Sequence, residues 1–157
     1  MVTINSTSRL FSIKTKIILT QTDTTVGFLS QNTVKLQEIK NRNSGKPFII
    51  VYKTFKALKQ NGLRIPNSQK ASFRRAKKTT YIVKNQAFRV ALDTLDSKLL
   101  TSVTWNYSTS ANESGKMFER TFCEQKADII VEDKSTLYEG MASSLYKINN
   151  CVTKRLR

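Results

Sequence analysis

The chain has 157 residues, of which 27 are Lys or Arg and 11 are Asp or Glu, so its formal net charge is +16. Such a surplus attracts anions such as nucleic acids, nucleotides and acidic membrane surfaces, although a lysine-rich proteome would give a similar composition. Histidine is absent, which excludes Ser-His and Cys-His dyads, and two cysteines are too few for a zinc site, so we expect no protein-built metal site. The length predicts one domain over residues 1–157, and the apolar runs are too short to cross a bilayer, so we expect a cytoplasmic protein without a membrane partner.

The first third of the chain alternates strand-like and helix-like patterns. A β-branched apolar run predicts a strand over 15–20, and a hydroxyl-rich loop over 20–27 follows it. The spacing of apolar residues over 32–39, with Asn32 or Thr33 as N-cap, predicts a helix. The apolar run at 47–52 predicts a buried strand, and 53–62 predicts a short helix that ends at Gly62.

The middle of the chain predicts one helix, a hairpin and a second helix. Pro66 and Asn67 begin a helix that continues to about Ala76 and is rich in Lys and Arg. Two runs of β-branched and apolar residues, 79–83 and 87–92, predict strands joined by a tight turn. The segment 94–102 predicts a short helix.

The last third predicts four strands and a helix. Alternation of polar and apolar residues predicts a strand over 103–109, followed by a polar loop and a helix over 117–126. Strands are expected at 127–133, 143–148 and 151–156, the last two as a hairpin. This order of elements favours a single-domain α/β fold, with a twisted open mixed sheet and flanking helices.

Three polar loops beside strong strands carry the residues that suit a binding site. The loops are "TDTTVG" (Thr22 to Gly27), "KNRNSGKP" (Lys40 to Pro47) and "STSANESG" (Ser108 to Gly115). Ligands of open α/β sheets bind at strand ends, and hydroxyls, fixed cations and glycines suit the alignment of phosphates. Each loop alone is better explained as an ordinary turn or helix end, so only their order and spacing favour a site.

These loops, in this order, resemble the YrdC-like threonylcarbamoyl-AMP synthase family. The matching residues are Thr22 to Gly27, then Lys40-Asn41-Arg42 with Lys46-Pro47, then Ser110-Ala111-Asn112 with Ser114-Gly115. Weaker matches are "TTYIV" (79–83), "FRV" (88–90) and "GMASSLYKI" (140–148). The resemblance covers roughly residues 15 to 155.

The resemblance implies an enzyme with the YrdC-like fold that condenses L-threonine, bicarbonate and ATP into threonylcarbamoyl-AMP and pyrophosphate. The product serves the N6-threonylcarbamoyl modification of adenosine 37 in tRNA, which separate transfer proteins complete. Catalytic roles are implied for Lys40 and Arg42, and threonine binding for Thr22 and Thr24. Nucleotide binding is implied for Lys40, Arg42, Arg89, Ser110, Asn112 and Ser143. Mg²⁺ is expected to arrive with ATP, since it prefers phosphate oxygens and water.

The first loop departs from the family pattern, because Gln21 replaces a proline and Val26 replaces a tyrosine expected beside the substrate. The final "RxG" of the family has become "KRLR". A diverged, non-catalytic protein that binds double-stranded RNA or tRNA on the same fold therefore stays open as an alternative. Such a protein would use the net charge of +16 and would show no threonine-dependent chemistry.

Overall fold

The computed structural model describes residues 13–41, 47–91 and 103–157. These residues form one nine-stranded sheet with the strand order β7-β1-β2-β6-β3-β5-β4-β8-β9. The strands are β1 (Ile18–Gln21), β2 (Val26–Ser30), β3 (Ile49–Tyr52), β4 (Thr79–Val83), β5 (Gln86–Val90), β6 (Trp105–Ser110), β7 (Ile129–Val131), β8 (Ser144–Ile148) and β9 (Thr153–Arg155). The pairs β1·β7, β3·β5 and β4·β8 are parallel and the other pairs are antiparallel, so the expected mixed sheet is confirmed.

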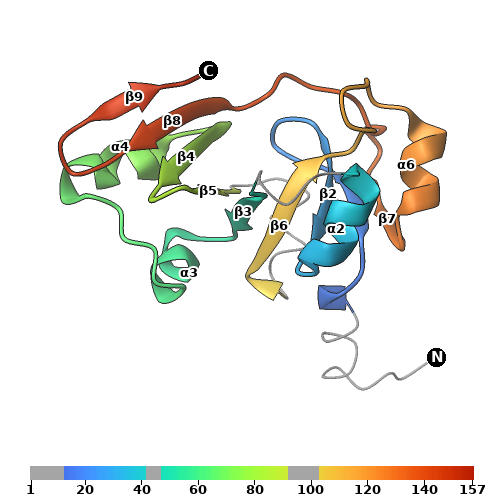
Figure 1. The fold of residues 1–157 in the computed structure, drawn as a ribbon, viewed down its shortest axis with the longest axis horizontal. Helices are drawn as coiled ribbons and strands as arrows, with labels where there is room; N and C mark the ends of the chain where they lie inside the picture. The colour runs from blue at the N-terminus through green and yellow to red at the C-terminus, as the bar shows by residue number, and fades with distance from the viewer. Residues whose placement is uncertain (1–12, 42–46, 92–102) are drawn as a thin grey trace.

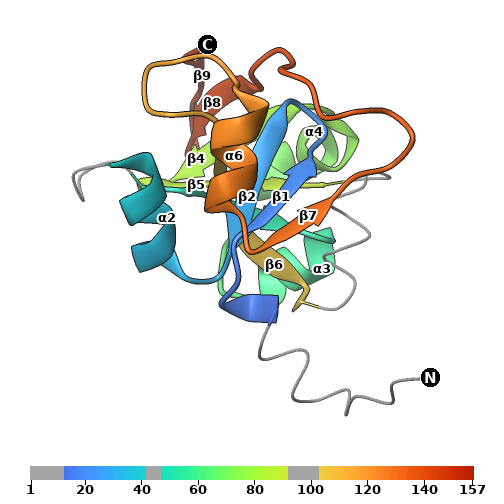
Figure 2. The same ribbon diagram turned by 90° about the vertical axis from the view of Figure 1, so that its right-hand side faces the viewer.

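The helices gather at the two ends of the sheet (Figure 1). α2 (Thr33–Lys40) and α6 (Arg120–Lys126) lie beside β1, β2 and β7, and Figure 2 shows α6 in front of β2. α4 (Lys70–Arg75), with the 3₁₀ turn η1 (Asn67–Gln69), lies at the end formed by β4, β8 and β9, and α3 (Phe55–Gln60) lies beside β3. Asn32 caps α2 by accepting a hydrogen bond from the Lys35 amide, and Thr54 caps α3 in the same way through Ala57.

Alternate side chains of the central strands point to opposite faces of the sheet. Phe88 and Tyr81 face each other on β5 and β4 and pack on Phe73 of α4, which makes an aromatic core under the helices. Ala87 and Arg89 alternate with Phe88 and therefore lie on the other face. Burial of an aromatic side chain such as Phe88 stabilises the fold by about 2–3 kcal/mol.

The same alternation divides β2. Val26 and Phe28 pack into a second core with Leu36 of α2 and Cys123 of α6. Gly27 points to the opposite face, where an added Cβ would lie 3.0 Å from the Thr22 side chain and 3.1 Å from the Thr109 carbonyl oxygen. Both helical layers therefore cover one face of the sheet, and the other face is left for a pocket.

Most of the predicted elements are confirmed, with shifts of a few residues at their ends. The exception is β2, which the sequence analysis placed partly in a loop; the strand forms because it pairs with β1 on one side and β6 on the other. The helix expected at 94–102 lies outside the described residues. The assignment of all 157 residues to one domain stays a prediction. Among the described residues, no helix is long and apolar enough to cross a membrane.

Candidate active site

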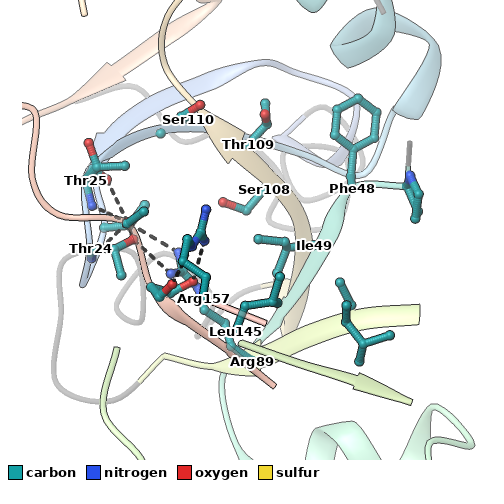
Figure 3. Close-up of a pocket in the computed structure, with 17 residues that line it drawn as sticks. Thr24, Thr25, Phe48, Ile49, Arg89, Ser108, Thr109, Ser110, Leu145 and Arg157 are labelled. Atoms are coloured by element: carbon teal, nitrogen blue, oxygen red, sulfur yellow. Dashed lines mark hydrogen bonds between the residues drawn. The ribbon is translucent and has the colours of Figure 1, made fainter. Parts of the chain in front are cut away.

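A pocket of about 380 Å³ opens on the sheet face opposite the helices (Figure 3). Its apolar floor comes from central strands and includes Ile49, Ile82, Ala87 and Leu145. Hydroxyl groups and two guanidinium groups make up its polar part: Thr22, Thr24, Thr25, Ser108, Ser110, Ser143, Arg89 and Arg157. A pocket of this size, apolar with a few convergent polar groups, suits a small-molecule ligand.

Residues 22–25, which follow β1 and include three threonines, form one wall of the pocket; we call them the threonine loop. The Thr22 hydroxyl donates to the Thr25 carbonyl oxygen at 2.7 Å and accepts from the amides of Thr24 and Thr25 at 3.3 Å. This turn holds the buried side chains of Thr22 and Thr24 with their Oγ1 atoms 3.2 Å apart. A rigid pair of hydroxyls is thus presented to the pocket before any ligand arrives.

Gly140 fixes this loop from the other side. Its amide donates to the Thr25 hydroxyl at 3.1 Å, and a Cβ at this position would lie only 2.0 Å from the Thr24 carbonyl oxygen. The neighbouring Tyr138 carbonyl accepts from the Val26 amide at 3.1 Å. The segment before β8 therefore lies directly against the threonine loop. Only glycine, which has no Cβ, fits at position 140 in this contact.

Arg89 enters the pocket from β5 and is only 4% exposed. Its Nη1 donates to the Thr24 hydroxyl at 2.9 Å, and its Nη2 donates to the Thr22 hydroxyl at 3.3 Å. Asp23 Oδ1 lies 2.9 Å from Nη1 and balances the charge. The buried Nε has no hydrogen-bond partner among the described residues, so this guanidinium keeps a free donor.

Ser143 and Arg157 lie at the β4–β8 side of the pocket. The hydroxyls of Ser143 and Thr80 are 2.8 Å apart, and Arg157 donates from Nε to the Ser143 carbonyl oxygen at 3.0 Å. Arg157 Nη2 lies 3.4 Å from the Ser143 hydroxyl. Arg157 was not expected at the site from the sequence, because its segment, "KRLR", only departs from the family pattern there.

Lys40 lies outside the lining of the pocket. It is buried at the end of α2, and its ammonium donates to the carbonyl oxygens of Ser110 and Asn112 at 3.0 and 2.5 Å and to Asn112 Oδ1 at 2.7 Å. Ser110 Oγ also donates to Asn112 Oδ1 at 2.7 Å, and Asn112 Nδ2 donates to the Lys116 carbonyl oxygen. Lys40 therefore fixes the turn after β6. Ser110 lines the pocket, whereas Lys40 and Asn112 do not.

The two departures in the first loop have structural explanations. Gln21 Oε1 accepts from the Tyr138 amide at 3.1 Å, a bond that ties the loop to the segment before β8. Val26 is buried in the core under α2 and α6, so its side chain does not face the pocket, contrary to the expectation of a position beside the substrate. Arg42 lies outside the described residues.

The pocket brings together Thr22, Thr24, Arg89, Ser110 and Ser143, and Lys40 and Asn112 support it from the adjoining turn. Among the described residues its lining has two guanidinium groups and no carboxylate. The adjoining Asp23 carboxylate pairs with Arg89, which leaves a net positive charge that favours an anionic ligand. No group of three or more Cys, Asp or Glu gathers to hold a metal ion in the described parts of the chain. The arrangement can bind and align phosphate or carboxylate groups against an apolar floor.

No family model and no curated protein sequence matches the chain. Among solved structures, the fold is similar to that of P. abyssi Sua5 complexed with L-threonine, with a TM-score of 0.75 and 17% identity over 99% of this chain and 55% of that one. E. coli YciO gives a TM-score of 0.72 and 14% identity over 97% of this chain and 87% of that one.

Full-length HypF in its phosphate- and nucleotide-bound form gives a TM-score of 0.70 and 14% identity, over 99% of this chain and 29% of that one. The chain thus spans about 55% of the length of the threonine-bound Sua5. At these identities the likeness concerns the fold, and it confirms the fold class expected from the sequence. The described chain has the fold shared by the Sua5 and YciO proteins.

Proposed function

We propose that the protein is an L-threonylcarbamoyladenylate synthase, a nucleotidyltransferase that acts in the N6-threonylcarbamoyl modification of tRNA. In this reaction the threonine amine and bicarbonate form a carbamate with loss of water. A carbamate oxygen then bonds to the α-phosphorus of ATP, the α–β phosphoanhydride bond breaks, and pyrophosphate leaves. Both steps involve anions, and their catalysis depends mainly on positioning and charge neutralisation.

The observation that supports this proposal most strongly is the position of Arg89. Its guanidinium is buried between the hydroxyls of Thr22 and Thr24 and keeps Nε without a partner among the described residues. In the proposed reaction Thr22 and Thr24 hold the threonine substrate, and Arg89 binds an anionic group beside it. Asp23 balances part of the Arg89 charge, and the guanidinium of Arg157 adds positive charge at the β4–β8 side of the pocket, so a carboxylate or a phosphate is the favoured ligand.

The nucleotide is proposed to bind along Ser110 and Ser143, over the apolar floor that includes Ile49. Lys40 holds the Ser110–Asn112 turn through its three hydrogen bonds, and contact between Lys40 and the nucleotide stays a prediction. Direct phosphate contacts by Arg42 and Asn112 are likewise proposed. Mg²⁺ bound to ATP would offset charge on the departing pyrophosphate.

The structural comparisons support the proposal at the level of ligand class. One similar structure, Sua5, is complexed with L-threonine, and another, HypF, is in a phosphate- and nucleotide-bound form. A pocket on this fold that takes threonine, bicarbonate and ATP is consistent with both. Separate proteins, as the family resemblance implies, are proposed to transfer the threonylcarbamoyl group to tRNA.

The test is pyrophosphate release from Mg·ATP by the purified protein, with L-threonine and bicarbonate present together and each omitted in turn. We expect release only with both co-substrates. Arg89→Gln and Ser143→Ala should each reduce it at least tenfold, since each removes a polar group of the pocket. Arg64→Gln is the matched control, because it removes an exposed arginine that does not line the pocket.

Pyrophosphate release that does not require threonine would contradict the proposal. So would release that falls equally in Arg64→Gln and Arg89→Gln. The absence of release by the folded protein under every condition would favour the alternative left open by the sequence, a non-catalytic RNA-binding protein on the same fold.

A further inference from the structure

The charges of the chain are segregated. Residues 47–91 contain eleven Lys and Arg and no Asp or Glu, whereas seven of the chain's 11 acidic residues stand in 113–139. The basic stretch forms α3, α4, β4 and β5, and the acidic stretch includes α6 and β7. Figure 1 shows α3 with α4 at one end of the molecule and α6 with β7 at the other. General lysine enrichment would leave acids scattered through the basic stretch, so it does not account for this division.

Within the basic end, cations surround one aromatic side chain. Phe55 of α3 packs on Phe73 of α4 with ring centroids 5.6 Å apart and is half-buried. The Arg74 guanidinium carbon lies 4.8 Å from the centre of the Phe55 ring, and the Lys59 ammonium lies 6.0 Å from it. Phe55, Lys56 and Lys59 also line a hollow on α3. We call Phe55 with Lys56, Lys59, Lys70 and Arg74 the α3–α4 surface.

The cations of this surface are available to a partner. Lys56, Lys59 and Arg74 are exposed, and none of them pairs with a carboxylate among the described residues. Lys70 and Arg74 are four residues apart on α4, which puts them on one face of that helix. The surface therefore offers several positive charges around an aromatic ring.

We propose that the α3–α4 surface binds single-stranded nucleic acid, with the phosphates on its Lys and Arg side chains and a base stacked at Phe55. Nucleic acid is favoured over a lipid surface because the large apolar residues of both helices, such as Leu58 and Phe73, are buried. None of the exposed large hydrophobic residues falls in 47–91. An aromatic ring flanked by cations is the arrangement that accepts unpaired bases.

This surface is separate from the pocket. Phe73 packs on Phe88 of β5, whereas Ala87 and Arg89 of the same strand point to the pocket on the opposite face of the sheet. Occupation of one site leaves the other open. The inference therefore does not depend on the proposed enzymatic activity, and the two can fail separately.

The test is fluorescence anisotropy of a labelled oligouridylate of about twelve nucleotides, titrated with the full chain at several salt concentrations. If about four phosphates are contacted, log K should fall with log salt at a slope of about −3. Lys59→Glu/Arg74→Glu should weaken binding at least tenfold at low salt and flatten the slope. Phe55→Leu should weaken it about fivefold or more, since leucine keeps the packing but not the stacking.

The chain offers a matched control on α6 and the segment after β7, where Lys134 stands. Phe122 of α6 is also half-buried, and the Lys126 ammonium lies 5.7 Å from its ring centre, but acidic residues surround it in the sequence. Lys126→Glu/Lys134→Glu, which changes the net charge equally, and Phe122→Leu should each change affinity less than threefold. Melting curves and circular dichroism spectra check that every variant folds.

Three results would overturn the proposal. The first is no binding of the oligonucleotide at low salt, and the second is an equal loss in the α3–α4 and α6 variants. The third is a clear preference for anionic lipid vesicles or duplex RNA over the single strand. A matching oligodeoxyuridylate shows whether the 2′-hydroxyl contributes, and tight binding of either single strand supports the proposal.

Discussion

Replacement of Lys40 by methionine tests how the turn beside the pocket is held. The ammonium of Lys40 donates to the Ser110 and Asn112 carbonyl oxygens and to Asn112 Oδ1. In Lys40→Met the Ser110 carbonyl keeps the Asn112 amide, and Asn112 Oδ1 keeps the Ser110 hydroxyl. The Asn112 carbonyl oxygen loses its donor and has no second one among the described residues.

The Asn112 carbonyl oxygen, left without a donor, costs about 1–3 kcal/mol. The lost bonds to the Ser110 carbonyl oxygen and to Asn112 Oδ1 cost less, because each acceptor keeps another donor, and methionine avoids the cost of burying a charge. We therefore expect the free energy of unfolding to fall by about 2 kcal/mol. For a chain of this length the melting temperature should fall by about 4–8 °C. Because Ser110 lines the pocket, affinity for ATP should fall as well. Differential scanning calorimetry and ATP titration measure the two effects.

The matched control is Lys35→Met on the same helix. The Lys35 ammonium lies 3.8 Å from Asp128 Oδ2, and both side chains are partly exposed, so the pair contributes about 0–1 kcal/mol. Its loss should change the melting temperature by less than about 4 °C and leave ATP affinity unchanged. A Lys40→Met protein as stable as the wild type would mean that the turn after β6 does not depend on the buried ammonium.

Three further predictions concern other parts of the structure. Gly140→Ala places a Cβ 2.0 Å from a backbone oxygen of the threonine loop, so it should cost about 3 kcal/mol in chemical denaturation and weaken threonine binding; wild-type values for both would contradict the contact. The Arg120 guanidinium holds the pKa of Glu132 below its ordinary 4.5. The Arg120–Glu132 ion pair therefore stabilises the fold above pH 4.5, and this stabilisation is lost as the pH falls through the lowered pKa of Glu132. The melting temperatures of the wild type and of Glu132→Gln should therefore converge in acid. Burial raises the pKa of the Cys123 thiol and Cys151 is exposed, so a thiol reagent should modify one cysteine in the native protein and both after unfolding.

Local patterns were sufficient to predict most strands and helices. The hairpin of β4 and β5 is an instance: β-branched residues predict the strands, and Lys84 and Asn85 between them adopt positive φ angles of 47° and 66°. Asn85 tolerates that conformation better than most residues. β2 was not predicted because Gly27 and the hydroxyls before it are typical of a loop. β2 forms because β1 and β6 pair with it on its two sides, and the pairing with β6 joins segments far apart in the sequence.

The contacts of the site depend on strand order, which the sequence does not reveal. Arg89 reaches Thr24, 65 residues earlier in the chain, although β5 is not a neighbour of β1 in the sheet. The motifs indicated that these residues belong together, but no local pattern indicates a direct hydrogen bond between them. Likewise, the burial of Lys40 against the Asn112 carbonyl follows from the packing of α2, whereas the family resemblance implied contact between Lys40 and the nucleotide.

The most direct test of the central claim is incorporation of ¹³C-bicarbonate into an adenylate, followed by mass spectrometry of reactions that contain Mg·ATP and L-threonine. We expect a product one mass unit heavier with the labelled bicarbonate, formed by the wild type and lost in Arg89→Gln. A folded wild-type protein that binds ATP and threonine but forms no labelled adenylate would contradict this claim.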